Sequence, residues 1–160
     1  MALVDDFKNT LSCWASGVAV VVTDDGGELY GLTVSSFTSV SLDPPLILVC
    51  INRENRLAEM IGRSGSFSVS LLASDQEAAS NYFASQGREP THGFTGGIDG
   101  QHTEHGPPIV QGCAGWLSCD LHETLTGGTH AIIIGRVVHA QAAAHTPLLY
   151  WNRAYRAIAQ

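Results

Sequence analysis

The chain has 160 residues, a length that suits one domain able to bury most of its apolar surface. Hydrophobic residues make up 44% and charged residues only 14%, with 17 glycines, which indicates a compact β-rich domain with much buried surface or a partner chain. The formal net charge of -7, without any cluster of Lys and Arg, argues against nucleic-acid binding. No cationic segment precedes an apolar core at the N-terminus, and no apolar run approaches the roughly 18 residues of a membrane span, so we expect a cytoplasmic protein without a membrane segment.

The first part of the chain predicts a helix followed by a hairpin. Apolar residues recur at helical spacing over residues 3–15, and Gly17 then ends the helical pattern. A β-branched run predicts a strand at residues 18–23, and the Asp-Asp-Gly-Gly turn that follows it leads into a return strand at residues 28–36.

The middle of the chain alternates between strand and helix signals. Pro44 and Pro45 interrupt the chain before residues 46–51, a continuous apolar run typical of a strand buried on both faces. A short helix is predicted over residues 56–63, and residues 66–72 alternate as a strand.

A second helix and a long loop are predicted next. Residues 74–77 read Ser-Asp-Gln-Glu, which resembles a capping box that opens a helix ending near Ala84. Residues 86–112 are rich in Gly, Pro, His and Thr with little periodicity, and a loop of this length in a small domain is usually functional or covers a partner. Strand signals then resume at residues 113–121, 130–140 and 148–151.

These elements together favour a mainly β fold. About six or seven strands with a few short helices, and no alternation of strand and helix, predict a closed or partly open antiparallel barrel. Because the chain has no internal repeat and no low-complexity tract, we expect a single domain over residues 1–160.

The cysteines and histidines do not form a metal-binding pattern. The four cysteines lack a C-x-x-C pair and lie in apolar or strand-like surroundings, which favours buried reduced thiols over disulfides or metal ligands. They are Cys13, Cys50, Cys113 and Cys119. Some of the seven histidines fall within residues 86–112, but no H-x-x-x-H or H-E-x-x-H spacing occurs, so no metal site is predicted.

The most informative stretch is GLTVSSFTSVSLDPPLILVC, residues 31–50. In it, strand-like residues run into small hydroxyl residues, a Leu-Asp-Pro-Pro turn and a fully apolar strand. Small residues beside a barrel wall let a flat ring lie against backbone N–H and C=O groups, and hydroxyls supply donors without bulk. We therefore expect the functional site here.

This stretch resembles the flavin reductase-like domain family, the short-chain NAD(P)H:flavin oxidoreductases that serve as reductase components of two-component flavin-dependent monooxygenases. The resemblance covers nearly the whole chain and implies a split β-barrel, an FMN-binding, Greek-key antiparallel barrel with a few short flanking helices. The supporting motifs are SGVAVV at residues 16–21, SGSF at 64–67, SDQ at 74–76 and PLLY at 147–150.

The resemblance implies two sets of flavin-binding residues. Those that hold the edge of the isoalloxazine ring are Thr33, Val34, Ser35 and Ser36. Those that border the ribityl chain and phosphate are Cys50, Ile51, Asn52, Asn55 and Arg56. The residues by themselves leave an alternative open, in which the serines only satisfy the backbone of a turn and the second set is a solvated turn with an ordinary helix cap.

A second family motif, Gly-Asp-His near the start of a late strand, points its histidine toward the nicotinamide. The matching residues are Gly128, Thr129 and His130, followed by Gly135, and His130 is the predicted catalytic residue. Thr129 replaces the usual Asp, which removes a carboxylate that could orient the imidazole or raise its pKa. His130 can still form hydrogen bonds with nicotinamide or flavin, and the alternative is a histidine at a strand start without a ligand role.

Some aromatic residues are further candidates for the site. Phe83 and Tyr155 are predicted to bind the cofactor, and together with Trp116 and Trp151 they could face a ring or a dimer partner. Aromatic residues at strand or helix positions are, however, more often part of the core.

The resemblance implies an NAD(P)H-dependent flavin reductase. It would transfer a hydride from NADH or NADPH to FAD or FMN and supply free reduced flavin to a separate flavin-dependent oxygenase, commonly as a homodimer with the site near the interface. Such chemistry needs ring placement rather than an array of acids and bases. Two alternatives stay open: a flavin-binding split barrel without hydride transfer, motivated by Thr129, and a monomeric structural barrel that binds no flavin.

Overall fold

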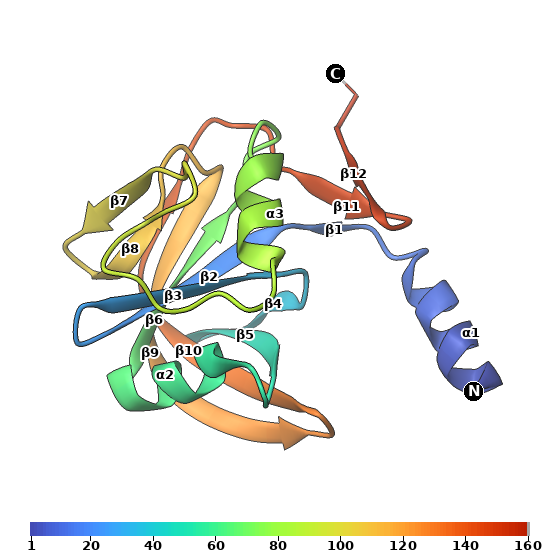
Figure 1. The fold of residues 1–160 in the computed structure, drawn as a ribbon, viewed down its shortest axis with the longest axis horizontal. Helices are drawn as coiled ribbons and strands as arrows, with labels where there is room; N and C mark the ends of the chain where they lie inside the picture. Colours follow the sequence, from blue (N-terminus) through green and yellow to red (C-terminus); the bar gives the residue numbers. More distant parts are fainter. Residues whose placement is uncertain (160) are drawn as a thin grey trace.

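The structure, a computed structural model, describes residues 1–159. Its helices are α1 (Ala2–Leu11), α2 (Arg56–Ser64) and α3 (Glu77–Ala84). Its strands are β1 (Ser16–Gly17), β2 (Ala19–Asp25), β3 (Glu28–Val34), β4 (Phe37–Leu42), β5 (Pro45–Asn52), β6 (Ser66–Leu71), β7 (Gly100–Thr103), β8 (Gly106–Val110), β9 (Gly115–Gly127), β10 (His130–Ala142), β11 (Leu149–Trp151) and β12 (Ala154–Arg156). The predicted mainly β, antiparallel architecture is confirmed (Figure 1).

The central feature is a seven-stranded sheet in the order β3-β2-β6-β9-β10-β5-β4, with every neighbouring pair antiparallel. The two edge strands, β3 and β4, follow each other in the chain with only Ser35 and Ser36 between them. In a flat sheet, six strand spacings would hold the edges about 29 Å apart, whereas the three peptide units between Val34 and Phe37 reach at most about 11 Å. The sheet must therefore curl until its edges meet, which makes it a barrel that is split between β3 and β4.

The barrel interior is closed by α2 and filled with apolar side chains. Leu57, Met60 and Ile61 of α2 are at most 1% exposed and pack against inward-facing residues of the strands. At the opposite wall, a Cβ built on Gly135 of β10 would lie 2.5 Å from the Phe67 ring, so glycine is the residue that lets this ring reach the wall. A tightly packed interior of this kind holds the strands, and thus the barrel rim, in fixed positions.

A second apolar cluster lies outside the barrel, under α3. Val20 and Val22 of β2 point into it while Val21 points into the barrel, so β2 is buried on both faces. Ala79 and Phe83 of α3 complete this layer. The burial of both faces fixes α3 against β2 and β3, beside the split.

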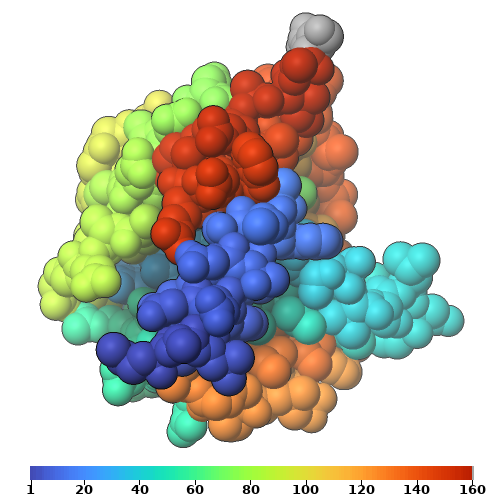
Figure 2. Space-filling view, turned by 90° about the vertical axis from the view of Figure 1, so that its right-hand side faces the viewer, coloured from blue at the N-terminus to red at the C-terminus, as the bar shows by residue number. Residues whose placement is uncertain are grey.

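The N-terminal helix lies apart from both clusters. None of its residues is buried, and Leu3, Phe7 and the following Trp14 are more than half exposed. Figure 1 shows α1 projecting from the body of the molecule, and Figure 2 shows it on the same face as the C-terminal strands.

Several predicted elements differ from the structure. The predicted loop of residues 86–112 contains a two-stranded hairpin, β7 and β8, and residues 37–42 form the edge strand β4 rather than a connection. β5 buries Ile47, Val49 and Ile51 in the barrel interior, whereas the residues between them on its other face are only half-buried, so the strand is not buried on both faces as predicted.

The predicted capping box of α3 is wrong. The helix begins at Glu77 with Gln76 as its N-cap, and no side chain caps it. Gln76 instead accepts a hydrogen bond from the N–H of Ala73 (2.9 Å) and donates one to the carbonyl of Gln111 (2.8 Å). The turn at Ser74 is thus held by a glutamine that also ties it to the segment after β8.

The cysteines carry no disulfide, and their burial differs from one to the next. Cys113 and Cys119 are buried as predicted, Cys50 is half-buried, and Cys13 is exposed because it follows the projecting helix. Burial raises the pKa of the Cys119 thiol to about 12, with the charge of Asp120 as a smaller cause, and burial also raises the pKa of Cys113. Among residues 1–159, none of the helices is long and apolar enough to cross a membrane.

Candidate functional site

A cleft of about 800 Å³ opens at the split of the barrel, a volume typical of a cofactor site. It is bordered by the end of β3, the end of β5, the start of α2, the segment after α3 and the start of β10. The lining residues are Tyr30, Leu32, Thr33, Val34, Ser35, Ser36, Cys50, Ile51, Asn52, Glu54, Asn55, Arg56, Ala84, Ser85, Gln86, Gly87, Arg88, Glu89 and His130.

The structure brings all of the predicted flavin-binding and catalytic residues to this cleft except Phe83 and Tyr155, and neither Trp116 nor Trp151 lines it. Phe83 is only 5% exposed and packs edge-on against Tyr82 and Phe94 in the cluster under α3, because the Ala79 to Phe83 face of that helix supplies the layer's apolar surface. Tyr155 lines a smaller neighbouring cavity, and its hydroxyl lies 2.7 Å from the hydroxyl of Ser80 and donates to Asn81 (2.9 Å).

One wall of the cleft is the outer edge of β3. Leu29 exchanges two backbone hydrogen bonds with Thr91 on this edge, and the carbonyl of Gly31 accepts a bond from Arg88 on the same edge. Because the hydrogen-bonding direction of a strand repeats every second residue, the N–H and C=O of Thr33 also point outward here, where the cleft lies. An edge strand thus offers main-chain donors and acceptors to whatever occupies the cleft.

The side-chain hydroxyls on this wall have different roles. Thr33 donates to the carbonyl of Ser80 on α3 (2.7 Å). Ser36 donates to the carbonyl of Cys50 (2.9 Å) and lies 3.2 Å from its N–H, so it ties the β3–β4 link to β5, the backbone role that the sequence left open. Ser35 is exposed, and its hydroxyl makes no hydrogen bond with residues 1–159. Two hydroxyls therefore hold the wall in place, and Ser35 faces the cleft beside them.

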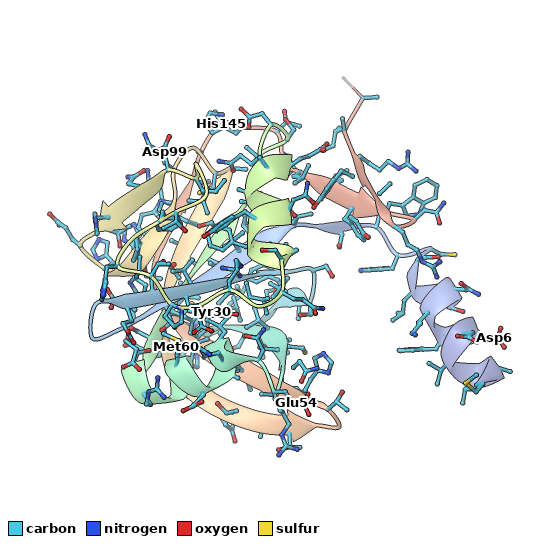
Figure 3. All side chains as sticks on the ribbon, viewed as in Figure 1. Asp6, Tyr30, Glu54, Met60, Asp99 and His145 are labelled. Carbon is cyan, nitrogen blue, oxygen red and sulfur yellow. The ribbon has the colours of Figure 1, made fainter. Side chains whose placement is uncertain are left out.

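The opposite end of the cleft is formed by the turn between β5 and α2. The side chain of Asn52 accepts from the N–H of Glu54 (2.9 Å), and that of Asn55 accepts from the N–H of Leu57 (2.9 Å) as the N-cap of α2. Figure 3 shows Glu54 on this turn. Arg56 follows at the first position of the helix and lines the cleft. The amides thus shape the turn, and their amide NH₂ groups and Arg56 are donors suited to an anion.

His130 stands at the start of β10, next to this turn. It pairs with Asn52 of β5 in the strand register, and the N–H of Arg53 donates to the carbonyl of Thr129 (3.0 Å). The hydroxyl of Thr129 lies 2.9 Å from Nδ1 of His130. With Nδ1 engaged by its neighbour, Nε2 is the ring nitrogen left for a ligand.

The segment after α3, from Ser85 to Glu89, forms the wall that sequence reasoning mostly missed. Arg88 holds it in place by donating to the carbonyls of Gly31 (2.5 Å), Phe83 (3.0 Å) and Ser85 (3.2 Å), while its guanidinium lies 5.2 Å from the ring centres of Tyr30 and Tyr82. The sequence signal for this wall was only the length and composition of the loop that begins at residue 86. Within residues 1–159, no cluster of His, Cys, Asp and Glu could hold a metal ion.

Comparison with known proteins assigns a family to this architecture. The sequence model of the flavin reductase like domain matches residues 11–159. The chain is 36% identical over 151 residues to the 4-hydroxyphenylacetate 3-monooxygenase reductase component of Thermus thermophilus, covering 94% of this chain and 93% of that protein. It is 34% identical over 147 residues to the 4-nitrophenol 4-monooxygenase/4-nitrocatechol 2-monooxygenase reductase component of Rhodococcus opacus, covering 92% of this chain and 77% of that protein.

A solved structure agrees with these sequence matches. The NADH:FAD oxidoreductase of Streptomyces globisporus, in complex with NAD and FAD fragments, superposes with a TM-score of 0.89 at 30% identity. The superposition covers 97% of this chain and 92% of that chain.

Proposed function

The chain belongs to the flavin reductase-like domain family, and from this membership we propose that it transfers a hydride from NADH or NADPH to FAD or FMN. The observation that carries the proposal is the 800 Å³ cleft, where the outward N–H and C=O of Thr33 form one wall and His130 stands at the other. A flat ring with carbonyl and ring-nitrogen acceptors needs such fixed donors at its edge, and the small side chains here leave room for it.

The residues of the β3 wall would orient the ring. We assign this role to the segment of Thr33, Val34, Ser35 and Ser36, in which main-chain groups act as donors and acceptors. Thr33 and Ser36 support it indirectly, since their hydroxyls tie the wall to α3 and β5. Bound flavin supplies the electron-accepting chemistry, so the chain itself needs to place two rings in contact and to keep the donors fixed.

The turn between β5 and α2 would hold the phosphate-bearing tail. Cys50 and Ile51 border it through the end of β5, while Asn52, Asn55 and Arg56 contribute amide and guanidinium donors. The partial positive charge at the start of α2 adds to the attraction for an anion. A phosphate is thus met by a helix terminus and a cation at the same end of the cleft.

His130 would bind the nicotinamide side of the site. Its Nδ1 is engaged by Thr129, a neutral hydroxyl, so the ring is oriented without a carboxylate. We assign it hydrogen bonding to the co-substrate, and no proton abstraction is required of it. Phe83 and Tyr155 would act from behind the wall, by supporting α3 and β3.

The proposal extends to the partners. The names of the relatives, reductase components of monooxygenases, support a separate oxygenase that receives the reduced flavin. The exposed apolar residues of α1 support a homodimer in which a second copy covers them. We further propose that residues 1–160 form one domain and that the reaction takes place in the cytoplasm, where reduced nicotinamide is available.

A second candidate function is flavin binding without hydride transfer, favoured by Thr129 in the place of the family's Asp. Steady-state mixing of the purified protein with NADH and excess FMN or FAD separates the two. Loss of the nicotinamide absorbance over many protein equivalents is expected for the reductase. Flavin binding without such turnover would establish the second function, and the absence of flavin binding would overturn both.

A further inference from the structure

An ion pair closes one side of the cleft. Arg56 at the start of α2 donates from both terminal nitrogens to the carboxylate of Glu89, on the segment after α3, with Nη2 3.5 Å from Oε1. Both residues line the cleft, and their side chains are 45% and 74% exposed. The pair therefore joins two walls of the cleft across solvent rather than within the protein interior.

Of the two arginines that line the cleft, Arg56 is the one whose guanidinium is not held by main-chain carbonyl groups. Arg88, the second arginine that lines it, already donates to three carbonyl groups and lies over aromatic rings. The acidic residues that line the cleft are Glu54 and Glu89. The side chain of Glu54 makes no hydrogen bond or ion pair with residues 1–159, whereas the carboxylate of Glu89 pairs with both terminal nitrogens of Arg56.

We propose that Glu89 competes with the phosphate of the flavin for Arg56 and so weakens the binding of phosphate-bearing flavins. The edge of a guanidinium that holds a carboxylate through two N–H groups cannot hold a phosphate in the same way at the same time, so the two anions compete for the Nη1 and Nη2 edge of Arg56. Glu89 thus lowers the preference of the cleft for phosphate-bearing flavins and favours their release. This inference rests on the proposed function, because it takes a flavin phosphate as the ligand of the cleft.

The expected effect is modest and depends on salt. Exposed ion pairs of this kind change an equilibrium by about 1.5- to 5-fold, so freeing Arg56 should tighten phosphate binding by that factor. The gain should shrink as ionic strength rises, because exposed charges are screened over about 10 Å at 0.1 M salt. A flavin without a phosphate should show no gain.

The test compares FMN with riboflavin, which carries the same ring without the phosphate. Dissociation constants are measured from the quenching of flavin fluorescence at low ionic strength for the unmodified protein, Glu89→Gln and Glu54→Gln. Glu54→Gln is the matched control, since it removes an equal charge from the same cleft without freeing Arg56. The expected result is FMN binding about 1.5- to 5-fold tighter in Glu89→Gln, a smaller change in Glu54→Gln, and unchanged riboflavin binding in both.

A third variant distinguishes the loss of the Arg56–Glu89 ion pair from a general change in the negative charge of the cleft. In Arg56→Gln, the further change Glu89→Gln should no longer tighten FMN binding, because the guanidinium for which the two anions compete is absent. Equal FMN affinities of Glu89→Gln and the unmodified protein, with riboflavin binding intact, would overturn this inference alone. If the unmodified protein binds neither flavin, the proposed function fails instead.

Discussion

The barrel interior and the cleft are built from the same strands, used in opposite ways. On β10, Ala131 and Ile133 point inward and are at most 7% exposed, while His130 is exposed at the cleft. On β5, Ile51 fills the interior next to Asn52, which shapes the cleft turn. The interior depends on side-chain volume, whereas the cleft depends on main-chain edges and a few polar groups.

The two regions therefore control different properties of the protein. Interiors packed at crystal-like density respond to a change of a single methyl group, whereas exposed positions tolerate most substitutions within about 0.5 kcal/mol. Substitutions in the interior should therefore change the free energy of unfolding, and substitutions at the cleft should change ligand binding at constant stability.

The largest effect is expected inside the barrel, at Phe67. Its side chain is fully buried in the barrel interior, so Phe67→Ala should lower the free energy of unfolding by about 3–5 kcal/mol through lost burial and the cavity left behind. Urea unfolding followed by circular dichroism measures this change. Leu125→Ala on β9, where the side chain is 43% exposed, is the control and should cost far less. Equal losses in the two variants would contradict the division.

A substitution at Gly135 adds volume to the interior instead of removing it. A Cβ at this position would lie 2.5 Å from Phe67 and 2.9 Å from the Cβ of Cys119, so Gly135→Ala should cost about 1–3 kcal/mol by overpacking. Phe67→Leu shortens the side chain that causes the clash, and the double variant should therefore lose less than the sum of the two single losses. Additive losses in urea unfolding would show that the two sites are independent.

The Cys119 thiol gives the interior a signature at high pH. Burial raises its pKa from 9.0 to about 12, so the folded chain keeps this proton at a pH where the unfolded chain releases it. The stabilisation is complete below about pH 9 and is lost as the pH rises toward 12, with a slope of up to about 1.4 kcal/mol per pH unit.

Comparison with Cys119→Ala isolates this contribution from other groups that titrate at high pH. The variant should show a shallower fall in the free energy of unfolding over the same pH range. Its absolute stability is not the readout, since the substitution also removes buried volume. Identical slopes for the two proteins would refute the assignment.

The sequence predicted the interior and much of the cleft for different reasons. Alternating and β-branched runs indicated β2, β3, β6 and β10, because burial imposes a period that a single chain reveals. β4 was missed because residues 37–42 mix polar and apolar side chains and most of them are exposed at a sheet edge, where burial imposes no pattern. The projecting Cys13 was misjudged for a related reason, since an apolar neighbourhood in the sequence does not require burial.

The cleft residues on β3, β5 and β10 were predicted from family resemblance, because the physical properties of these residues alone do not require a binding site. Small hydroxyl residues in a turn suit a flat ring and an ordinary strand end equally well. The wall from Ser85 to Glu89 could not be predicted, because its position depends on Arg88 meeting carbonyls and rings that are far away in the sequence. Long-range contacts of irregular segments leave no periodic signal.

Ser35 tests the cleft side of the division. It is exposed at the split, so Ser35→Phe should leave the melting temperature almost unchanged while its ring occupies the space beside the β3 edge. The dissociation constant for FMN should rise at least about tenfold, equivalent to ~1.4 kcal/mol. Ser39→Phe on β4, also exposed but not part of the cleft wall, should bind FMN normally. Loss of binding in both variants would point to a general effect of bulk on this part of the sheet.

The smallest effect is expected at His130, because its contribution is one hydrogen bond in an exposed position. His130→Ala should raise the KM for NADH about 2- to 10-fold, equivalent to ~0.5–1.5 kcal/mol, and leave FMN binding and the melting temperature nearly unchanged. His122→Ala on the neighbouring strand β9, which does not line the cleft, is the matched control. Thr129→Val should have part of the same effect, since it removes the hydroxyl 2.9 Å from Nδ1 that orients the ring. An unchanged KM in His130→Ala would show that the nicotinamide does not bind at this end of the cleft, because a nicotinamide stacked beside β10 would lose its hydrogen bond to His130.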